Sequence, residues 1–245
     1  MKAIWLIFVT LAAGVVAGTF FGIMNLAIAE PLVDKAISFE VARQVNAGHP
    51  VDYAQMADYR NWQKGGEVVS AVVLGMALSA IFGIVFAYTR KALPGKNNVR
   101  KGIVLAGIIW FALFFVTSLK YPANPPAVEA QGTTIYFRQE LYVAFLAISG
   151  LGLFGAAYAA MRYKERIKPI VLIPLIYVPI IAGAYFALPP NGYEVTTEMK
   201  SLVDSFRIVS ELDMGMLWAV IGLTSGLLWD RFKPQLETDQ TLRSV

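Results

Sequence analysis

Residues 3–29 read AIWLIFVTLAAGVVAGTFFGIMNLAIA, an unbroken run of 27 residues without a charged side chain. A helix needs about 20 apolar residues to cross the hydrocarbon core of a bilayer, so this stretch is long enough to span it. Five further apolar stretches are separated by short charged segments: about 68–88, 102–119, 141–161, 169–188 and 208–229. Backbone groups find no hydrogen-bond partner in lipid, so continuous apolar runs predict helices, whereas the strands of a barrel would alternate. We therefore expect an all-α polytopic fold, a six-transmembrane-helix bundle forming one integral membrane domain over 1–245.

The basic residues predict how this bundle is oriented. If the N-terminus lies inside, the inner segments hold 13 of the 21 lysines and arginines, most of them in the short loops 90–101 and 162–168. Loops with such a positive charge stay on the cytoplasmic side of a plasma membrane protein. The outer loops and outer helix ends hold 13 of the 17 acidic residues. The sequence therefore predicts three outward hairpins, a net acidic outer face, and both termini in the cytoplasm with a tail over 230–245.

The first outer loop, 30–67, is long enough to contain structure of its own. Apolar residues recur in it at helical spacing, which predicts an amphipathic helix over 32–45: Val33, Ile37, Val41 and Val45. The second outer loop begins with Tyr121-Pro122-Ala123-Asn124-Pro125-Pro126, which cannot be helical through its prolines. We expect this segment to form a stiff, extended cap over the bundle.

The first span also has an alternative interpretation as a cleavable signal sequence. Ala27-Ile28-Ala29 resembles the small-residue site at which signal peptides are cut. However, the apolar run is much longer than the core of about 7–15 residues that such peptides have. The length of the run therefore favours a helix that is retained in the membrane.

The composition excludes several classes of function. The chain has no cysteine and one histidine, so it offers no ligands for iron–sulfur clusters, thiolate-bound metals or a haem held by two of its own histidines. It contains no phosphate-binding glycine loop, nucleophile elbow or zinc-protease motif, so we expect no enzyme activity and no permanently bound cofactor. The net charge of +4 follows from membrane topology, so lipid and not nucleic acid is the expected surrounding partner.

Small residues at four-residue spacing predict close packing between helices. Stripes of this kind let membrane helices approach one another, because lipid is as apolar as the helices themselves. The first span carries Gly14, Gly18 and Gly22, with Asn25 continuing the same face. The second span carries a matching stripe, and spans four and six carry shorter ones: Ala71, Gly75, Ser79, Gly83 and Ala87; Gly152, Ala156 and Ala160; Gly222 and Gly226.

Acidic residues at the outer helix ends are the candidate ligands of a cation. Charges near the bilayer are costly, so the few that occur there often serve function. Five carboxylates lie at these ends, among them Glu67 at the start of the second span, and four of them are the candidate ligands: Glu30, Glu140, Glu211 and Asp213. Glu211 and Asp213 lie about 200° apart around their helix, and Glu211 is closer to the face of the glycines, so we expect Glu211 to face inward. These carboxylates would form an acidic outer vestibule that captures a cation.

Two arginines stand beside these carboxylates, and they allow two interpretations. In the first, Arg138 and Arg207 balance the charge of an empty metal site. In the second, Glu140 with Arg138 and Glu211 with Arg207 are ordinary ion pairs at the membrane surface. His49 has two interpretations as well, because an imidazole would add affinity for cobalt, nickel or zinc, while a lone loop histidine is often only solvated.

Several passages spread along the chain resemble the family of cobalt transporter subunits called CbtA. The most specific is Lys120-Tyr121-Pro122-Ala123-Asn124-Pro125-Pro126, followed by Thr134-Ile135 and by Arg138 with Tyr142. The others are Glu30-Pro31-Leu32, Leu188-Pro189-Pro190, and Phe206-Arg207 followed by Leu217-Trp218. One passage departs from the pattern, because the family loop usually reads Pro-Pro-Gly-Val-Gly where this chain has Pro125-Pro126-Ala127-Val128-Glu129.

The resemblance implies that the chain brings cobalt across the inner membrane for corrinoid synthesis. It also implies a small, single-span, histidine-bearing partner subunit called CbtB, which would supply the imidazoles that this chain lacks. Our first hypothesis is therefore a membrane subunit of a cation uptake system, with cobalt as the transported ion. The alternative hypothesis is a non-catalytic structural or accessory subunit of a larger membrane complex, in which the small-residue faces serve partner helices.

Overall fold

The computed structural model of the protein describes residues 3–128, 135–190, 192–193 and 195–232. Within these ranges every element of secondary structure is a helix, which confirms the predicted fold class. Six of the described helices are long and apolar enough to cross a membrane: Ile4–Asn46, Tyr53–Thr89, Asn98–Ser118, Ile135–Arg162, Pro169–Ala187 and Lys200–Phe232. The chain divides into two compact units, one made of residues 1–109 and 212–245 and the other of residues 110–211.

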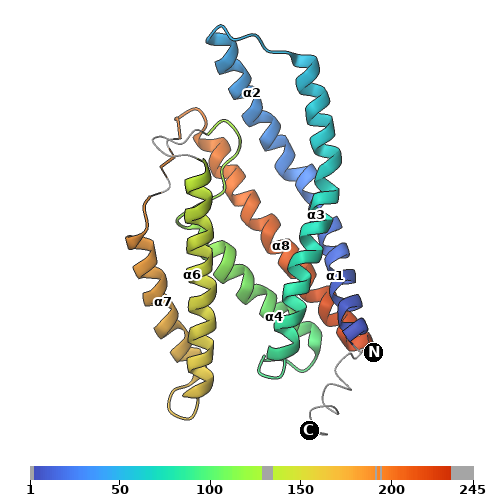
Figure 1. Cartoon of the computed structure of the whole chain (residues 1–245), viewed down its shortest axis with the longest axis vertical. Coiled ribbons are helices and arrows are strands. Elements are labelled where there is room, and N and C mark those ends of the chain that lie inside the picture. Colours follow the sequence, from blue (N-terminus) through green and yellow to red (C-terminus); the bar gives the residue numbers. More distant parts are fainter. Residues whose placement is uncertain (1–2, 129–134, 191, 194, 233–245) are drawn as a thin grey trace. The chain divides into compact units, whose positions relative to one another are not determined.

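The first unit contains a long helical hairpin. Its first arm runs without a break through α1 (Ala3–Met24), the π-helix η1 (Asn25–Ala29) and α2 (Glu30–Asn46). Its second arm is α3 (Tyr53–Thr89), which lies beside the first arm (Figure 1). The 43 residues from Ile4 to Asn46 are about 64 Å long at 1.5 Å per residue. Because the hydrocarbon core is only about 30 Å thick, α2 and the first turns of α3 extend beyond it.

The region expected to be a loop, 30–67, is therefore almost entirely helical. The predicted amphipathic helix is present as α2, but it continues the first span and is not separated from it. The second arm begins at Tyr53, well before the apolar stretch at 68–88, because the Asp52 carboxylate accepts the amides of Ala54 and Gln55 at 3.0 Å each. Such a cap starts a helix whether or not the residues that follow are apolar.

The small-residue stripes bring the two arms together, as the sequence predicts. A β-carbon added to Gly75 of α3 would come within 2.8 Å of the Gly18 backbone of α1. The same unit contains α4 (Asn98–Trp110) as far as Ile109 and α8 (Lys200–Phe232) from Leu212 onward, and these two helices also meet at glycines. A β-carbon on Gly222 would lie 2.6 Å from the carbonyl oxygen of Gly102. These faces are thus filled by helices of the same chain.

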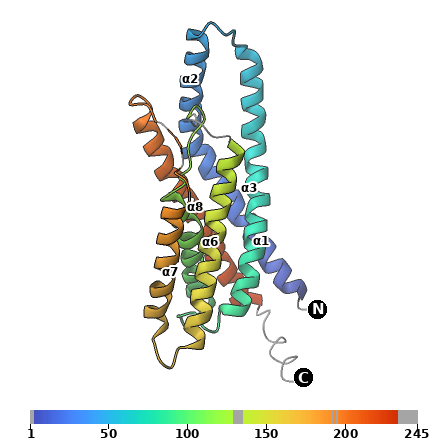
Figure 2. The same ribbon diagram turned by 60° about the vertical axis from the view of Figure 1, so that its left-hand side comes forward.

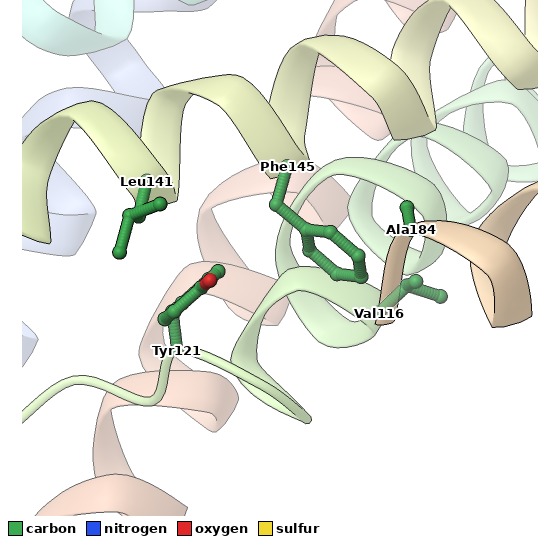
Figure 3. Close-up of a cluster of buried hydrophobic side chains, with 5 residues drawn as sticks. All are labelled: Val116, Tyr121, Leu141, Phe145 and Ala184. Carbon is green, nitrogen blue, oxygen red and sulfur yellow. The ribbon is translucent and has the colours of Figure 1, made fainter. Parts of the chain in front are cut away.

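The second unit is built on an antiparallel pair of helices, α6 (Ile135–Arg162) and α7 (Pro169–Ala187), which lie side by side in Figure 2. The π-helix η2 (Phe111–Phe115) and the short α5 (Val116–Ser118) pack against α6. Figure 3 shows the buried cluster that joins these elements, in which Phe145 and Leu141 of α6 lie with Val116 of α5, Tyr121 of the segment after α5 and Ala184 of α7.

A buried hydroxyl pair stabilises the π-helix of this unit. Ser149 of α6 donates its only hydroxyl proton to the carbonyl oxygen of Ala112 in η2. The Tyr177 hydroxyl, 2.6 Å from the Ser149 oxygen, must then donate to it. We expect Ser149→Ala to lower the free energy of unfolding by about 1–3 kcal/mol, because it leaves two buried polar groups without partners. Thermal unfolding in detergent checks this, with the exposed Ser205→Ala as a control that should change little.

The orientation in the membrane stays a prediction, and the chain is well suited to its test. Because it has no cysteine, a single one can be introduced without removing others. His49 and Lys164 are both exposed, and they lie in loops predicted to be outer and inner respectively. In intact cells a membrane-impermeant maleimide should label His49→Cys and leave Lys164→Cys unlabelled until the cells are opened. The reverse pattern would invert the predicted topology.

Candidate functional site

Six polar side chains meet between the two arms of the hairpin in the first unit, and we call them the hairpin cluster: Asn25, Glu30, Asp34, Arg60, Lys64 and Glu67. Arg60 of α3 donates to Glu30, and also to Asp34 at 2.9 Å. Lys64, one turn further along α3, donates to Asp34 at 2.6 Å. Two basic side chains of one arm therefore hold two carboxylates of the other.

The hairpin cluster lies where the two small-residue stripes end. The stripe of the first arm continues into Asn25, and the stripe of the second arm begins four residues after Glu67, at Ala71. Asn25 donates its side-chain amide to one carboxylate oxygen of Glu67. The sequence did not predict either residue as a ligand, although pairing the two stripes by their four-residue register would have predicted this contact.

Glu67 has one oxygen that remains open. Its Oε2 atom is buried and accepts no hydrogen bond from any residue in the described ranges. The carboxylate of Glu30 is close enough to repel that of Glu67, while the charges of Arg60 and Lys64 act in the opposite direction. An unpartnered carboxylate oxygen beside other acidic groups is a position that a cation would stabilise.

The aromatic residues of α3 indicate how deep the hairpin cluster lies. Tyr59 and Trp62 stack on one another with ring centroids 5.9 Å apart, and Trp62 is 72% exposed. Exposed tyrosine and tryptophan side chains collect at the boundary between lipid and water. Arg60 and Lys64 alternate with these rings along the same two turns, so the hairpin cluster belongs at the membrane surface, within reach of dissolved ions.

In the second unit, the proline-rich segment 120–126 is non-helical, as predicted. Hydrogen bonds connect its first two residues to α7 and to the residues just after α7. Lys120 donates to the carbonyl oxygen of Tyr185 and lies 4.7 Å from the centre of that ring. The buried Tyr121 donates its hydroxyl to the carbonyl oxygen of Pro189 at 2.7 Å. Burial raises the pKa of Tyr121, so the hydroxyl keeps the proton that it donates. Pro122, Pro125 and Pro126 keep the backbone that follows these two residues out of a helix.

The two predicted charge-balancing arginines contact neutral groups. Arg207 of α8 donates through Nε and Nη2 to the side-chain oxygen of Asn124, at 3.1 and 2.7 Å. Arg138 of α6 lies over the ring of Tyr193, with its central carbon 3.9 Å from the ring centre. Among the described residues, neither arginine pairs with Glu140 or Glu211. Ordinary ion pairs of Arg138 with Glu140 and of Arg207 with Glu211, the second interpretation of these arginines, are therefore not seen among the described residues.

The turn after this segment contains a strained residue. Ala127 has a φ of +70°, in the left-handed region that a residue with a β-carbon adopts only at a cost of about 1–2 kcal/mol. In the family that this chain resembles, the corresponding loop usually has glycine at the position of Ala127. We expect Ala127→Gly to raise the free energy of unfolding by up to about 1 kcal/mol, because relief of strain exceeds the added freedom of the unfolded chain. Thermal unfolding measures the change, and Ala127→Val should shift it in the opposite direction.

Glu211 and Asp213 are both located in α8, and each has at least one carboxylate oxygen that accepts no hydrogen bond from a described residue. Glu211 faces the Ser118 hydroxyl and Tyr142 within the second unit, and its Oε2 atom is buried without a partner in the described ranges. Asp213 is only 2% exposed, and neither of its oxygens accepts a hydrogen bond from a described residue. Asp213 is thus the more completely buried of the two, whereas we expected Glu211 to face inward. A carboxylate inside a membrane-spanning helix is costly, so both remain candidates for function.

The remaining predicted ligands are exposed. Glu140 lines an open recess of about 470 Å³ along one face of α6, together with Tyr136, Gln139, Val143, Ala144 and Ala147. His49 lies in the turn that follows α2. In the described part of the chain, no three histidine, aspartate or glutamate side chains form a group that could hold a metal ion. The role of Glu30, Glu140, Glu211, Asp213 and His49 as ligands thus stays a prediction, and Glu129 lies outside the described residues.

Comparison with known proteins identifies one family. Searches of the curated proteins and of the solved structures gave no match. The sequence model of the family described as probable cobalt transporter subunit (CbtA) matches residues 4–230, nearly the whole chain, in agreement with the resemblance seen in the sequence. With its six helices able to span a membrane, this multi-pass plasma membrane protein belongs to the CbtA family of probable cobalt transporter subunits.

Proposed function

We propose that this chain is the membrane subunit that captures cobalt ions for uptake, and that buried carboxylates form its capture sites. The observation that carries this proposal is the open oxygen on each of two glutamates, Glu67 and Glu211. A buried carboxylate oxygen without a partner is costly, and a bound cation would compensate that cost. Cobalt accepts carboxylate oxygens as ligands and also binds imidazole.

The hairpin cluster supplies the counter-ions of the proposed capture site. Arg60 and Lys64 form ion pairs with Glu30 and Asp34 in the structure. They thus have the charge-balancing role that we expected for Arg138 and Arg207. An arriving divalent ion would repel both basic side chains and compete with them for the same oxygens. In the empty cluster the two basic side chains would offset most of the negative charge of the carboxylates, which keeps the cluster stable. The carboxylate oxygens would still attract a cation.

A partner subunit completes this proposal. The family description calls its members subunits, and this chain has one histidine, which is too few for a nitrogen-rich cobalt site. A small single-span partner that carries histidines would supply the missing ligands. In that arrangement this chain provides the oxygen ligands, and Glu140, Asp213 and His49 are further candidates to hand the ion on.

A second candidate function is that of a non-catalytic accessory subunit, and one observation favours it. The recess on α6 is open and contains two alanines, so it could receive a helix of another subunit. Against it, the glycine stripes of α1 and α3 are already filled by one another. Capture of the ion by this chain is therefore the function that we prefer.

Uptake of labelled cobalt tests the proposal directly. Cells with and without the chain, each with the partner co-expressed, are compared at submicromolar cobalt with nickel and zinc as competitors. Uptake that requires the chain and is competed selectively is the expected result. Uptake that does not change when the chain is removed would overturn the proposal and favour the accessory role.

A further inference from the structure

The last turn of α8 gathers two different sets of side chains in the first unit. Trp229 lies under the guanidinium of Arg90, at 5.8 Å, and Asp230 accepts a hydrogen bond from Asn98 at 2.6 Å. Phe232 stacks on Trp5 of α1, with ring centroids 4.9 Å apart, and meets Phe8 edge-on at 5.5 Å. The basic loop between α3 and α4 and an aromatic surface of α1 are thus brought to the same turn of one helix.

The charge around this turn is strongly positive. Residues 90–101 contain five basic residues and no acidic one, and Arg231 adds a sixth. We call these six residues the basic collar: Arg90, Lys91, Lys96, Arg100, Lys101 and Arg231. The acidic residue of the turn, Asp230, is engaged by Asn98. Lys96, Arg100 and Arg231 are exposed, so their charges face the surroundings.

The loop is shaped to hold these charges together. Gly95 has a φ of +139°, and a β-carbon there would come within 3.2 Å of the Arg100 side-chain stem. Glycine therefore lets the chain fold back over Arg100 before α4 begins. Asn97 then accepts the backbone amide of Arg100 at 2.9 Å, which fixes the start of that helix.

The aromatic surface beside the basic collar is open to lipid. Trp5 and Phe8 remain 43% and 48% exposed although both contact Phe232. Asp230 and Arg231 follow directly after the uncharged stretch 214–229 of α8, which is apolar enough to lie in lipid, so the last turn of this helix belongs at the headgroup layer. Aromatic side chains next to basic ones at that level are typical of the boundary where lipid headgroups meet their acyl chains.

We propose that the basic collar binds the phosphate headgroup of an anionic phospholipid, whose acyl chains lie against Trp5, Phe8 and Phe232. Clusters of four or more basic residues at the end of a membrane helix attract anionic lipids, and each contributes to the attraction. The aromatic surface adds an apolar contact for the acyl chains of the lipid, which a free anion does not have. This inference does not depend on the ion that the protein transports.

Thermal unfolding of the purified full chain in neutral detergent tests this site, with added phosphatidylglycerol or phosphatidylcholine of the same acyl chains. We expect only phosphatidylglycerol to raise the unfolding temperature. In the variant Lys96→Gln/Arg100→Gln/Arg231→Gln the apparent affinity for this lipid should fall at least ~10-fold. Glutamine keeps the stem that packs on Gly95, so the loop itself is preserved.

The matched control removes the same charge elsewhere. Lys164→Gln/Arg166→Gln/Lys168→Gln alters another exposed basic loop and should keep the full response to phosphatidylglycerol. High salt should weaken the response of the unaltered protein, because it screens the basic collar. Phe232→Ala should also weaken the response, because it removes part of the surface on which the acyl chains lie. These two measurements test the proposal even if the triple variant does not fold. An unchanged response in the collar variant, an equal loss in the control, or the same response to inorganic phosphate would each overturn the site.

Discussion

Replacement of Gly75 by alanine is expected to disrupt the packing of α1 against α3. The added methyl group would meet the carbonyl oxygen of Gly14 and come within 2.8 Å of the Gly18 backbone. Backbone atoms cannot swing aside as a flexible side chain does, so the two helices would have to separate. Overpacking of this kind costs about 1–3 kcal/mol, and the separation would also disturb the hairpin cluster at the end of the stripe. Thermal unfolding in detergent should show a clear decrease.

The same helix provides the control for this experiment. Gly66 has no atom within 4 Å of where its β-carbon would lie, so Gly66→Ala adds the same methyl group without a clash. Alanine favours a helix over glycine by up to about 1 kcal/mol, so this variant should be unchanged or slightly more stable. Equal unfolding temperatures for the two variants would contradict the close approach of α1 and α3.

Glu67→Gln and Glu211→Gln should each lower the rate of cobalt uptake strongly without unfolding the protein. Glutamine preserves the size of the side chain, and at position 67 its oxygen can still accept the Asn25 amide. The variant loses only the negative charge that would hold the ion. Interactions with a charged group contribute about 1.5–3 kcal/mol, so uptake at submicromolar cobalt should fall by roughly 10- to 100-fold.

Each of these variants has a control on its own helix. Asp58 of α3 and Asp204 of α8 are exposed, so Asp58→Asn and Asp204→Asn remove a charge from solvent and should leave uptake nearly unchanged. Folding is verified by elution as a single species and by the unfolding temperature. If both glutamine variants were folded and transported cobalt at the normal rate, these carboxylates would have no part in capture.

The apolar stretches predicted the spans well, but they did not predict where the helices end. The boundary of an apolar run marks where lipid ends, whereas a helix continues as long as its backbone bonds are favourable. The first arm therefore continues from Met24 through η1 into α2, past the charged Glu30 and Asp34. At the other arm, the Asp52 cap starts α3 far outside the apolar stretch.

The role of Glu30 and Glu211 as ligands stays a prediction, and the sequence did not reveal which side chains contact the carboxylates of the hairpin cluster. The sequence named these two glutamates because acidic residues near the ends of membrane-spanning helices are costly. It did not identify Arg60 and Lys64 as the partners of Glu30 and Asp34, because those contacts join residues that are about 30 positions apart. It also expected Arg207 beside Glu211, where the structure has Arg207 bound to Asn124.

The sequence by itself determined the solvent, the helical class, the six spans and the stripes of small residues, because these follow from composition and from spacing along one helix. The tertiary structure alone decided which stripes pair, where Glu67 finds Asn25, and how the last turn of α8 joins a basic loop to an aromatic surface. Those outcomes depend on which helix faces pack together, and in lipid that choice follows from the fit of surfaces in space and not from hydrophobicity along the chain.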